Sequence, residues 1–222
     1  PTDTKLLGLN DVTFSVGATT ASVEEKTEVW DSASAVGFDI SGATVTPTHT
    51  TQGNHNWART VETFSTSSGA SLSYNLEGST TEGGYPNTNQ VVAFSKETSA
   101  PSGGGGYSEM DFALYTDNAG LIVVENGVAY NNWAILGSWT LSDTFGIDIS
   151  SSGVVTYKKN GVTFHTSSYT ASGDYYVMAA NYRMGAITLD ASTGGTIISA
   201  TGLTDNTVTT QHYAFTRDSS NL

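Results

Sequence analysis

The sequence predicts a single all-β domain built from antiparallel strands. Apolar residues recur with period two in segment after segment, which is typical of half-buried strands. Two Asn-Gly dipeptides stand between apolar runs, as in tight hairpins. Charged residues make up 13% of the 222-residue chain, against about 25% in ordinary soluble proteins, and Gly, Ser, Thr and Asn supply the polarity instead. This composition suits short strands joined by many turns.

Period two is clearest where Phe145, Ile147 and Ile149 alternate with small or polar residues. Phe112 and Leu114 show the same spacing. No stretch of a dozen residues carries an apolar stripe at the helical period. These segments are therefore expected to be strands with one face in a core.

Asn160-Gly161 is the stronger of the two turn signals. Both central positions of a type I′ turn need positive φ, which Asn and Gly tolerate best. A two-residue loop at this point pairs Lys159 with Val162 and Tyr157 with Phe164, so that both aromatic rings fall on one face.

Asn126-Gly127 repeats the pattern shortly after the apolar run at residues 121–124. Two hairpins in succession predict an antiparallel sheet.

At 222 residues the chain fits one sandwich or barrel, so we expect one domain over residues 1–222. Its N- and C-terminal segments are expected to supply closing or edge strands, among them Ile197-Ile198 and Tyr213 to Phe215. Long loops are predicted at residues 46–57, 78–89 and 99–107.

The chain carries 21 acidic and 8 basic residues, a formal charge of −13. Nucleic acids and anionic membranes gain affinity from Lys and Arg, so neither is expected as a partner. A neutral glycan, a surface protein or a divalent cation fits better, with acidity for solubility alone as the alternative. No apolar run approaches the roughly 18 residues of a membrane span, so no membrane insertion is expected. The chain has no Cys, which excludes disulfides and thiolate metal sites.

The segments Tyr107 to Tyr115, Phe145 to Ile149 and Gly153 to Gly161 resemble the concanavalin A-like lectin/glucanase superfamily. This superfamily also includes laminin-G-like and SPRY-like modules of surface proteins and phage structural proteins. The resemblance covers about residues 30–190. It implies an antiparallel two-sheet jelly-roll sandwich of about a dozen strands. It does not imply a function, because this fold carries lectins, glycanases, lyases and structural modules.

The best candidate for a catalytic motif is Glu109-Met-Asp111, which resembles the start of the alternating carboxylate motif of glycanases. Glycanases of the superfamily carry a further alternating carboxylate as acid/base, and Ala113-Leu114 occupies that position here. We therefore expect no enzyme, and we expect Asp111 to hydrogen-bond between strands. A polysaccharide lyase is an alternative, because Tyr182-Arg183 and His165 supply its residue types, but the net charge repels a polyanionic substrate.

No metal centre or other cofactor is expected. The four His residues stand at positions 49, 55, 165 and 212, without the spacing of a zinc site. Calcium takes oxygen ligands and is left open, although no loop has a Ca²⁺-ligand spacing.

Sugar-binding sites combine an aromatic ring with amide donors and acceptors, since sugars present apolar C–H faces and hydroxyl edges. The predicted ligand-binding residues have this mix: Tyr130, Asn131, Asn132, Trp133 and Trp139 as the first group, with Asn54, Asn56 and Trp57 as the second. Tyr85, Asn87 and Asn89 form a third group. In the alternative interpretation, Trp133 and Trp139 close the core and the Asn residues serve turns.

The leading hypothesis is a non-enzymatic recognition or adhesion module that binds a neutral glycan or a surface partner. It would belong to a virion fibre or decoration protein or to a cell-surface adhesin, on the virion surface or in an extracellular location. We expect a homo-oligomer or a part of a larger assembly. The first alternative is a purely structural subunit, which a broad apolar patch or a symmetric oligomer would favour.

Overall fold

The computed structural model describes residues 13–16, 19–23, 29–48, 56–77, 90–100, 107–117, 119–181, 185–190 and 200–201. The chain divides into two compact units, one made of Pro1–Glu25 with Ile198–Leu222 and the other of Lys26–Ile197. In the first unit, β1 (Thr13–Val16), β2 (Thr19–Val23) and β16 (Ala200–Thr201) form an antiparallel sheet in the order β1-β2-β16.

The expected closing strands at Ile197-Ile198 and Tyr213 to Phe215 lie outside the described residues. A single domain over residues 1–222 therefore stays a prediction.

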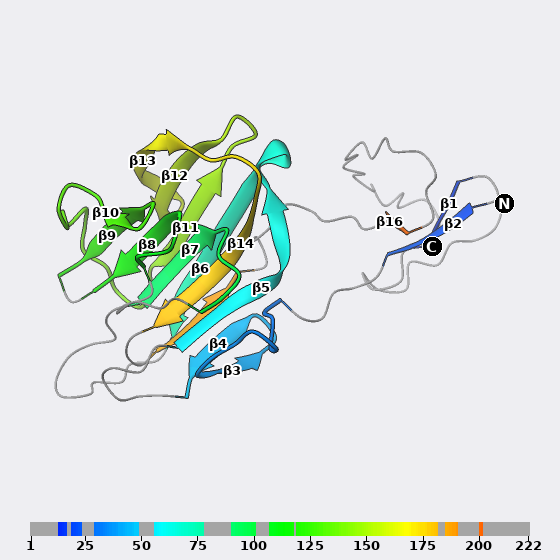
Figure 1. Cartoon of the computed structure of the whole chain (residues 1–222), viewed down its shortest axis with the longest axis horizontal. Helices are drawn as coiled ribbons and strands as arrows, with labels where there is room; N and C mark the ends of the chain where they lie inside the picture. The colour runs from blue at the N-terminus through cyan, green and yellow to red at the C-terminus, as the bar shows by residue number, and fades with distance from the viewer. Residues whose placement is uncertain are drawn as a thin grey trace, which may run out of the picture. The chain divides into compact units, whose positions relative to one another are not determined.

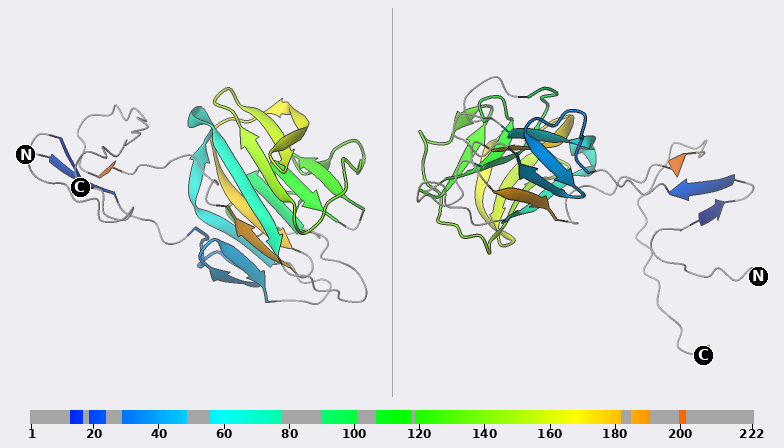
Figure 2. Two further views of the ribbon diagram at one scale, coloured as in Figure 1. Left: turned by 180° about the vertical axis from the view of Figure 1, so that it is seen from behind. Right: turned by 90° about the horizontal axis from the view of Figure 1, so that it is seen from below.

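The second unit is a sandwich of two antiparallel sheets (Figure 1). The six-stranded sheet has the order β10 (Val128–Ala129), β9 (Leu121–Glu125), β8 (Phe112–Thr116), β7 (Gln90–Ser95), β14 (Asp174–Asn181) and β5 (Asn56–Ser65). The seven-stranded sheet has the order β13 (Val162–Thr170), β12 (Val154–Lys159), β11 (Thr144–Ile149), β6 (Ala70–Glu77), β15 (Ala186–Leu189), β4 (Thr44–Pro47) and β3 (Phe38–Ser41). Figure 2 shows the same two layers from behind and from below.

The all-β prediction is confirmed. One 3-10 turn, η1 (Thr66–Ser68), is the only helical element among the described residues. Nowhere in that part of the chain is there a helix of the length and apolar character needed to cross a membrane.

The inward faces of the two sheets meet in one apolar core. Phe145, Ile147 and Ile149 of β11 point into it, as their spacing predicts, and each is at most 2% exposed. Phe112 and Leu114 alternate inward in the same way on the facing sheet. Burying a side chain of this size contributes about 1.5 to 3 kcal/mol, so this core is the main source of stability.

The strands β7, β8 and β9 are buried along their whole length. Val92 and Leu114 face the core between the sheets, whereas Val91, Ala113 and Val124 belong to a second apolar cluster on the outer face. The larger members of this outer cluster are Trp57, Met110, Tyr115 and Met178, with Tyr107 and Tyr176 packed against them. The six-stranded sheet therefore has an apolar surface on both sides.

The consecutive strands β14 and β15 each enter a different sheet. In the six-stranded sheet β14 lies between β7 and β5, and in the seven-stranded sheet β15 lies between β6 and β4. Tyr175 consequently pairs with Phe64, and Ile187 pairs with Val45, although these partners are far apart in the sequence.

Both Asn-Gly turns have the predicted conformation. The φ angles are 50° and 73° at Asn126 and Gly127, and 52° and 76° at Asn160 and Gly161. All four are positive, as a type I′ turn requires.

The register of the second hairpin is confirmed at the turn but wrong farther from it. Lys159 pairs with Val162 as predicted, whereas Tyr157 pairs with His165 instead of Phe164. A β-bulge adds Phe164 to β13 as an extra residue, and the sequence carries no clear signal for this insertion. Phe164 and Tyr157 both still pack toward the core, because a bulge re-aims the side chains that follow it.

Asp143 ties the Asn160 turn to the segment that precedes β11. Its carboxylate accepts hydrogen bonds from Asn160 Nδ2 at 2.7 Å and from Thr140 N at 2.8 Å, and Lys159 Nζ is 3.7 Å away. Asn160 Oδ1 in turn accepts from Thr144 N at 2.9 Å. Burial alone would raise the pKa of Asp143, but the hydrogen bonds and the Lys159 charge outweigh it and hold that pKa below its ordinary value.

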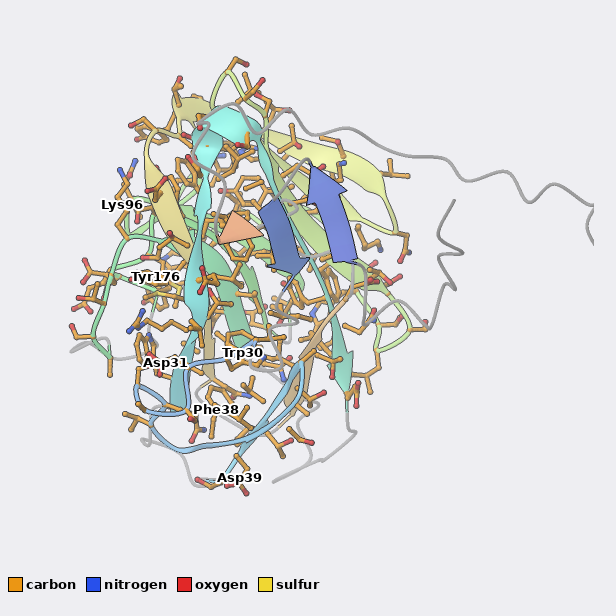
Figure 3. The ribbon with its side chains drawn as sticks, turned by 90° about the vertical axis from the view of Figure 1, so that its right-hand side faces the viewer. Trp30, Asp31, Phe38, Asp39, Lys96 and Tyr176 are labelled. Atoms are coloured by element: carbon orange, nitrogen blue, oxygen red, sulfur yellow. The ribbon has the colours of Figure 1, made fainter. Side chains whose placement is uncertain are left out.

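Residues 29–36 cover the edge of the six-stranded sheet at β5 (Figure 3). Trp30 is fully buried there. Asp31 forms an ion pair with Arg59 at 2.8 Å, and the Arg59 guanidinium lies 4.4 Å from the centroid of the Tyr176 ring. This side of the sandwich is therefore closed by charged and aromatic side chains.

We expect Gly127→Ala to destabilise the domain more than Gly161→Ala. Both changes place a side chain at positive φ, which costs about 1 kcal/mol. At Gly161 the new Cβ meets open space, whereas at Gly127 it falls on the backbone carbonyl of Ser108. Urea unfolding should show an additional loss of about 2 kcal/mol for Gly127→Ala. Equal losses would contradict the packing of the first turn.

The Asp143 network should contribute stability that depends on pH. Its folded-state pKa lies below the ordinary value of 3.8, so the contribution is present above that value and is lost as pH falls through the folded pKa. Asp143→Asn should therefore lower the urea midpoint at neutral pH, and the gap to wild type should narrow as the pH falls through the folded-state pKa of Asp143. Asp39→Asn, at an exposed position of β3, is the control that should show no gap.

Candidate functional site

Three consecutive residues in the turn after β10 have a left-handed backbone. Asn131, Asn132 and Trp133 have φ angles of 45°, 54° and 68°, and Ala134 N donates to Tyr130 O at 3.1 Å to close the turn. Asn tolerates this region through local hydrogen bonding, whereas for a residue such as Trp it costs about 1 to 2 kcal/mol. Strain of this kind persists only where packing overrides it, and it is concentrated at functional sites.

Packing of the Trp133 ring shows what holds this turn. The ring lies edge to face with Tyr107 at 5.1 Å and with Tyr115 at 5.8 Å between centroids. Tyr107 and Tyr115 contact each other in the same way at 5.8 Å. Tyr115 is 8% exposed within the outer-face cluster, whereas Trp133 is 42% exposed. These three rings form an aromatic platform on the outer face of the six-stranded sheet, with Asn131 and Asn132 exposed in the same turn.

Two members of the platform were not predicted as site residues. Tyr115 directly follows Leu114 on β8, so period two alone places it on the face opposite the core. Tyr107 follows the glycine run at residues 103–106, where nothing in the sequence indicates its contact with Trp133.

Tyr130 does not join the aromatic platform. Its backbone N–H donates to Val123 O at 2.8 Å, and Val123 belongs to the core between the sheets. The Tyr130 ring lies 4.4 Å from the ring of His165 on β13. The predicted first group is therefore divided, with Trp133 on the outer face and Tyr130 beside the opposite sheet.

A second contact joins the two sheets close to Tyr130 and His165. The Tyr157 hydroxyl of β12 donates to Glu125 Oε1 of β9 at 3.1 Å, and Glu125 is 4% exposed. Burial first, and then the charge and hydrogen bond of Glu125, raise the pKa of Tyr157 well above its ordinary value. Tyr157 therefore stays protonated and acts as a donor at neutral pH.

Trp139 is half-buried, and the described part of the second group is buried. Trp139 packs against the core, edge to face with Phe145 at 6.3 Å, and its Nε1 donates to Asp117 O at 2.8 Å. Asn56 and Trp57, at the start of β5, are at most 1% exposed. These positions stabilise the sandwich, and none of them offers an exposed ring or amide to a ligand. Asn54, Tyr85, Asn87 and Asn89 lie outside the described residues.

The incomplete carboxylate motif has a structural role. Asp111 Oδ2 accepts a hydrogen bond from Lys96 N at 2.8 Å, which confirms the predicted bond between neighbouring strand segments. The Tyr182-Arg183 pair of the lyase alternative lies outside the described residues. Among the residues that the structure describes, no three His, Asp or Glu side chains gather as a metal site requires, so no donor set for Ca²⁺ is assigned.

Comparisons with known proteins identify the fold. No family model matches the chain, and no curated protein matches its sequence. The SPRY domain of human HERC1 matches over 72% of this chain and 96% of its own, with 14% identity and a TM-score of 0.53. The TRIM65 PSpry domain matches over 74% and 92%, with 14% identity and a TM-score of 0.53. The VIP36 exoplasmic/lumenal domain, in a Ca²⁺/Man3GlcNAc-bound form, matches over 72% and 85%, with 12% identity and a TM-score of 0.51.

These likenesses confirm the resemblance to concanavalin A-like sandwiches at the level of the fold. The two-sheet jelly-roll architecture that the resemblance implies is therefore confirmed.

The left-handed turn leads to a test on Asn132. Asn132→Gly should keep the free energy of unfolding within about 0.5 kcal/mol of wild type, because Gly adopts positive φ freely. Asn132→Val should lower it by about 1 to 2 kcal/mol, because a β-branched side chain clashes there. Thermal unfolding measures both, and an equal tolerance of Gly and Val would contradict the turn.

Proposed function

We propose that this domain is a non-enzymatic recognition module that binds a neutral glycan at the aromatic platform. We place it in a virion fibre or decoration protein or in a cell-surface adhesin, on the virion or outside the cell. The observation that carries the proposal is the Trp133 ring, which is 42% exposed yet held edge to face by Tyr107 and Tyr115.

A fixed and exposed aromatic ring suits a sugar because the apolar C–H face of the sugar can stack on it. Asn131 and Asn132 precede Trp133 in the same turn, and both residues are exposed. Amide groups offer both donors and acceptors to sugar hydroxyls. The left-handed conformation restricts the three residues before binding, which reduces the entropy lost on association.

The surroundings of the turn favour a neutral ligand. Residues 126–142 contain no Asp, Glu, Lys or Arg. A charged sugar would therefore find no ionic partner in this segment, and the net charge of −13 disfavours a polyanion at long range. One ring and a few hydrogen bonds support about millimolar to micromolar affinity per site, so adhesion requires several copies on one particle.

The fold agrees with this proposal, since the VIP36 domain of similar architecture has been solved with Ca²⁺ and Man3GlcNAc bound. No cluster of acidic residues for Ca²⁺ occurs among the residues described here. We therefore expect binding at the aromatic platform to persist in the presence of EDTA.

A glycan array probed with a multivalent form of the protein tests the proposal. Trp133→Ala should abolish binding to neutral glycans, and Trp133→Phe should restore part of it, because stacking needs an aromatic face. Val61→Ala is the control, since Val61 is an exposed apolar residue on β5, at the edge of the six-stranded sheet opposite β10. Unfolding curves must first show that each variant folds.

Full binding by a folded Trp133→Ala protein would contradict the proposed site. Turnover of a neutral glucan or a uronate polymer by the purified protein would contradict the non-enzymatic function itself.

A further inference from the structure

The sandwich has several segments free of formal charge, among them residues 40–58 and 63–76, and two others form one side of it. Residues 126–142 and 160–173 contain no Asp, Glu, Lys or Arg, although the chain carries 29 such residues and a net charge of −13. The first segment includes β10 and the turn that follows it, and the second includes the whole of β13. We call the surface formed by these two segments the neutral side.

The two segments lie together although they belong to different sheets. Both β10 and β13 are edge strands, and they stand at the same side of the sandwich in Figure 1. The contact of Tyr130 with His165 at 4.4 Å joins the two segments directly. The hydrogen bond from Tyr157 to Glu125 joins the adjacent strands β12 and β9.

The neutral side also exposes apolar side chains. Of the ten large apolar residues that are exposed in the described part of the chain, six lie in these two segments besides Trp133, whose ring belongs to the outer face. The most exposed are Val162 at 70%, Val128 at 68% and Tyr169 at 52%. A concentration of exposed apolar groups on one side marks an interaction surface.

The opposite side of the sandwich has a different character. Its edge strands are β3 and β5. The strand β3 is short and carries Asp39, and residues 29–36 cover β5 with the Asp31–Arg59 ion pair. Figure 3 shows Asp31 and Asp39 on this part of the molecule. Charges and covering segments are the usual means of protecting sheet edges, and the segments of the neutral side lack charges.

We propose that the neutral side binds a second copy of this chain. Two molecules of the same strongly negative charge repel each other, and a contact through acidic surfaces would add like-charge pairs at close range. The neutral side is free of that penalty. Of the cations near this side, Lys158 and Lys159 of β12 are paired with Asp148 and Asp143, and Lys96 lies over the Tyr175 ring.

The contact is made by side chains and does not extend the sheet. Irregularities interrupt the pairing of β12 with β13 at two places, between Val154 and Thr156 and between Tyr157 and Lys158. Such bulges twist an edge strand away from regular pairing with another strand. Val162 and Tyr169 are then the groups that a second copy can cover.

Sedimentation velocity of the full chain over about 1 to 200 µM tests the association. We expect a monomer–dimer equilibrium that strengthens as NaCl is raised, because salt screens the repulsion between two acidic molecules. Val162→Glu and Tyr169→Glu should each weaken dimerisation about tenfold or more, by placing two like charges in the contact. Val61→Glu, at a 40% exposed position on β5, is the matched control and should have no such effect.

A second measurement uses the absence of Cys from the chain. Under mild oxidation, Val162→Cys should give a disulfide-linked dimer, whereas Val61→Cys should stay monomeric. A monomer throughout the concentration range would overturn the proposal, and so would equal weakening by Val61→Glu.

The proposal is independent of glycan binding. Trp133→Ala should leave the dimer intact, because its ring belongs to the outer face. Val162→Glu should leave the affinity of one site for a neutral glycan unchanged. Val162→Glu should lower only the additional affinity for a multivalent glycan that a dimer gains from having two linked sites.

Discussion

The burial of the six-stranded sheet on both faces is the constraint on which the rest of this structure depends. One face of β7, β8 and β9 meets the other sheet in the core, and the other face carries a second apolar cluster. Apolar surface of that extent has to be covered by side chains from outside the sheet. Tyr107 and Trp133 come from connecting segments and pack there against Tyr115. The aromatic platform therefore covers part of the apolar outer face of this sheet. The Trp133 ring remains partly exposed there and is accessible to a ligand.

Much of the fold could be predicted from the sequence because its signals are local. The alternation of Phe145, Ile147 and Ile149 and the two Asn-Gly turns report backbone preferences that need no tertiary information. The bulge at Phe164 could not be predicted in this way. It depends on how β13 is accommodated beside β12, and a shift of one residue leaves the composition of the strand unchanged.

The candidate site was harder to predict, because neighbours in the sequence need not share a surface. Tyr130 and Trp133 are separated by only two residues, but the left-handed turn between them sends one ring toward His165 and the other toward Tyr107. Trp139 is of a residue type common in sugar-binding sites, but it packs against the core. Its hydrogen bond to the Asp117 carbonyl shows why an indole suits that position, since a buried N–H needs an acceptor.

The placement of β14 and β15 has a consequence for how the chain folds. Each is inserted between two strands that are synthesised much earlier, β5 and β7 in one sheet and β4 and β6 in the other. During synthesis the six-stranded sheet cannot be completed before Asn181 has been made, and the seven-stranded sheet cannot be completed before Leu189. Until then the facing edges of β5 and β7, and those of β4 and β6, stay unpaired. Contacts between such distant segments slow folding, because a long loop must be closed before they form. The nascent protein therefore passes through a prolonged state with open sheet edges, in which it depends on protection from aggregation.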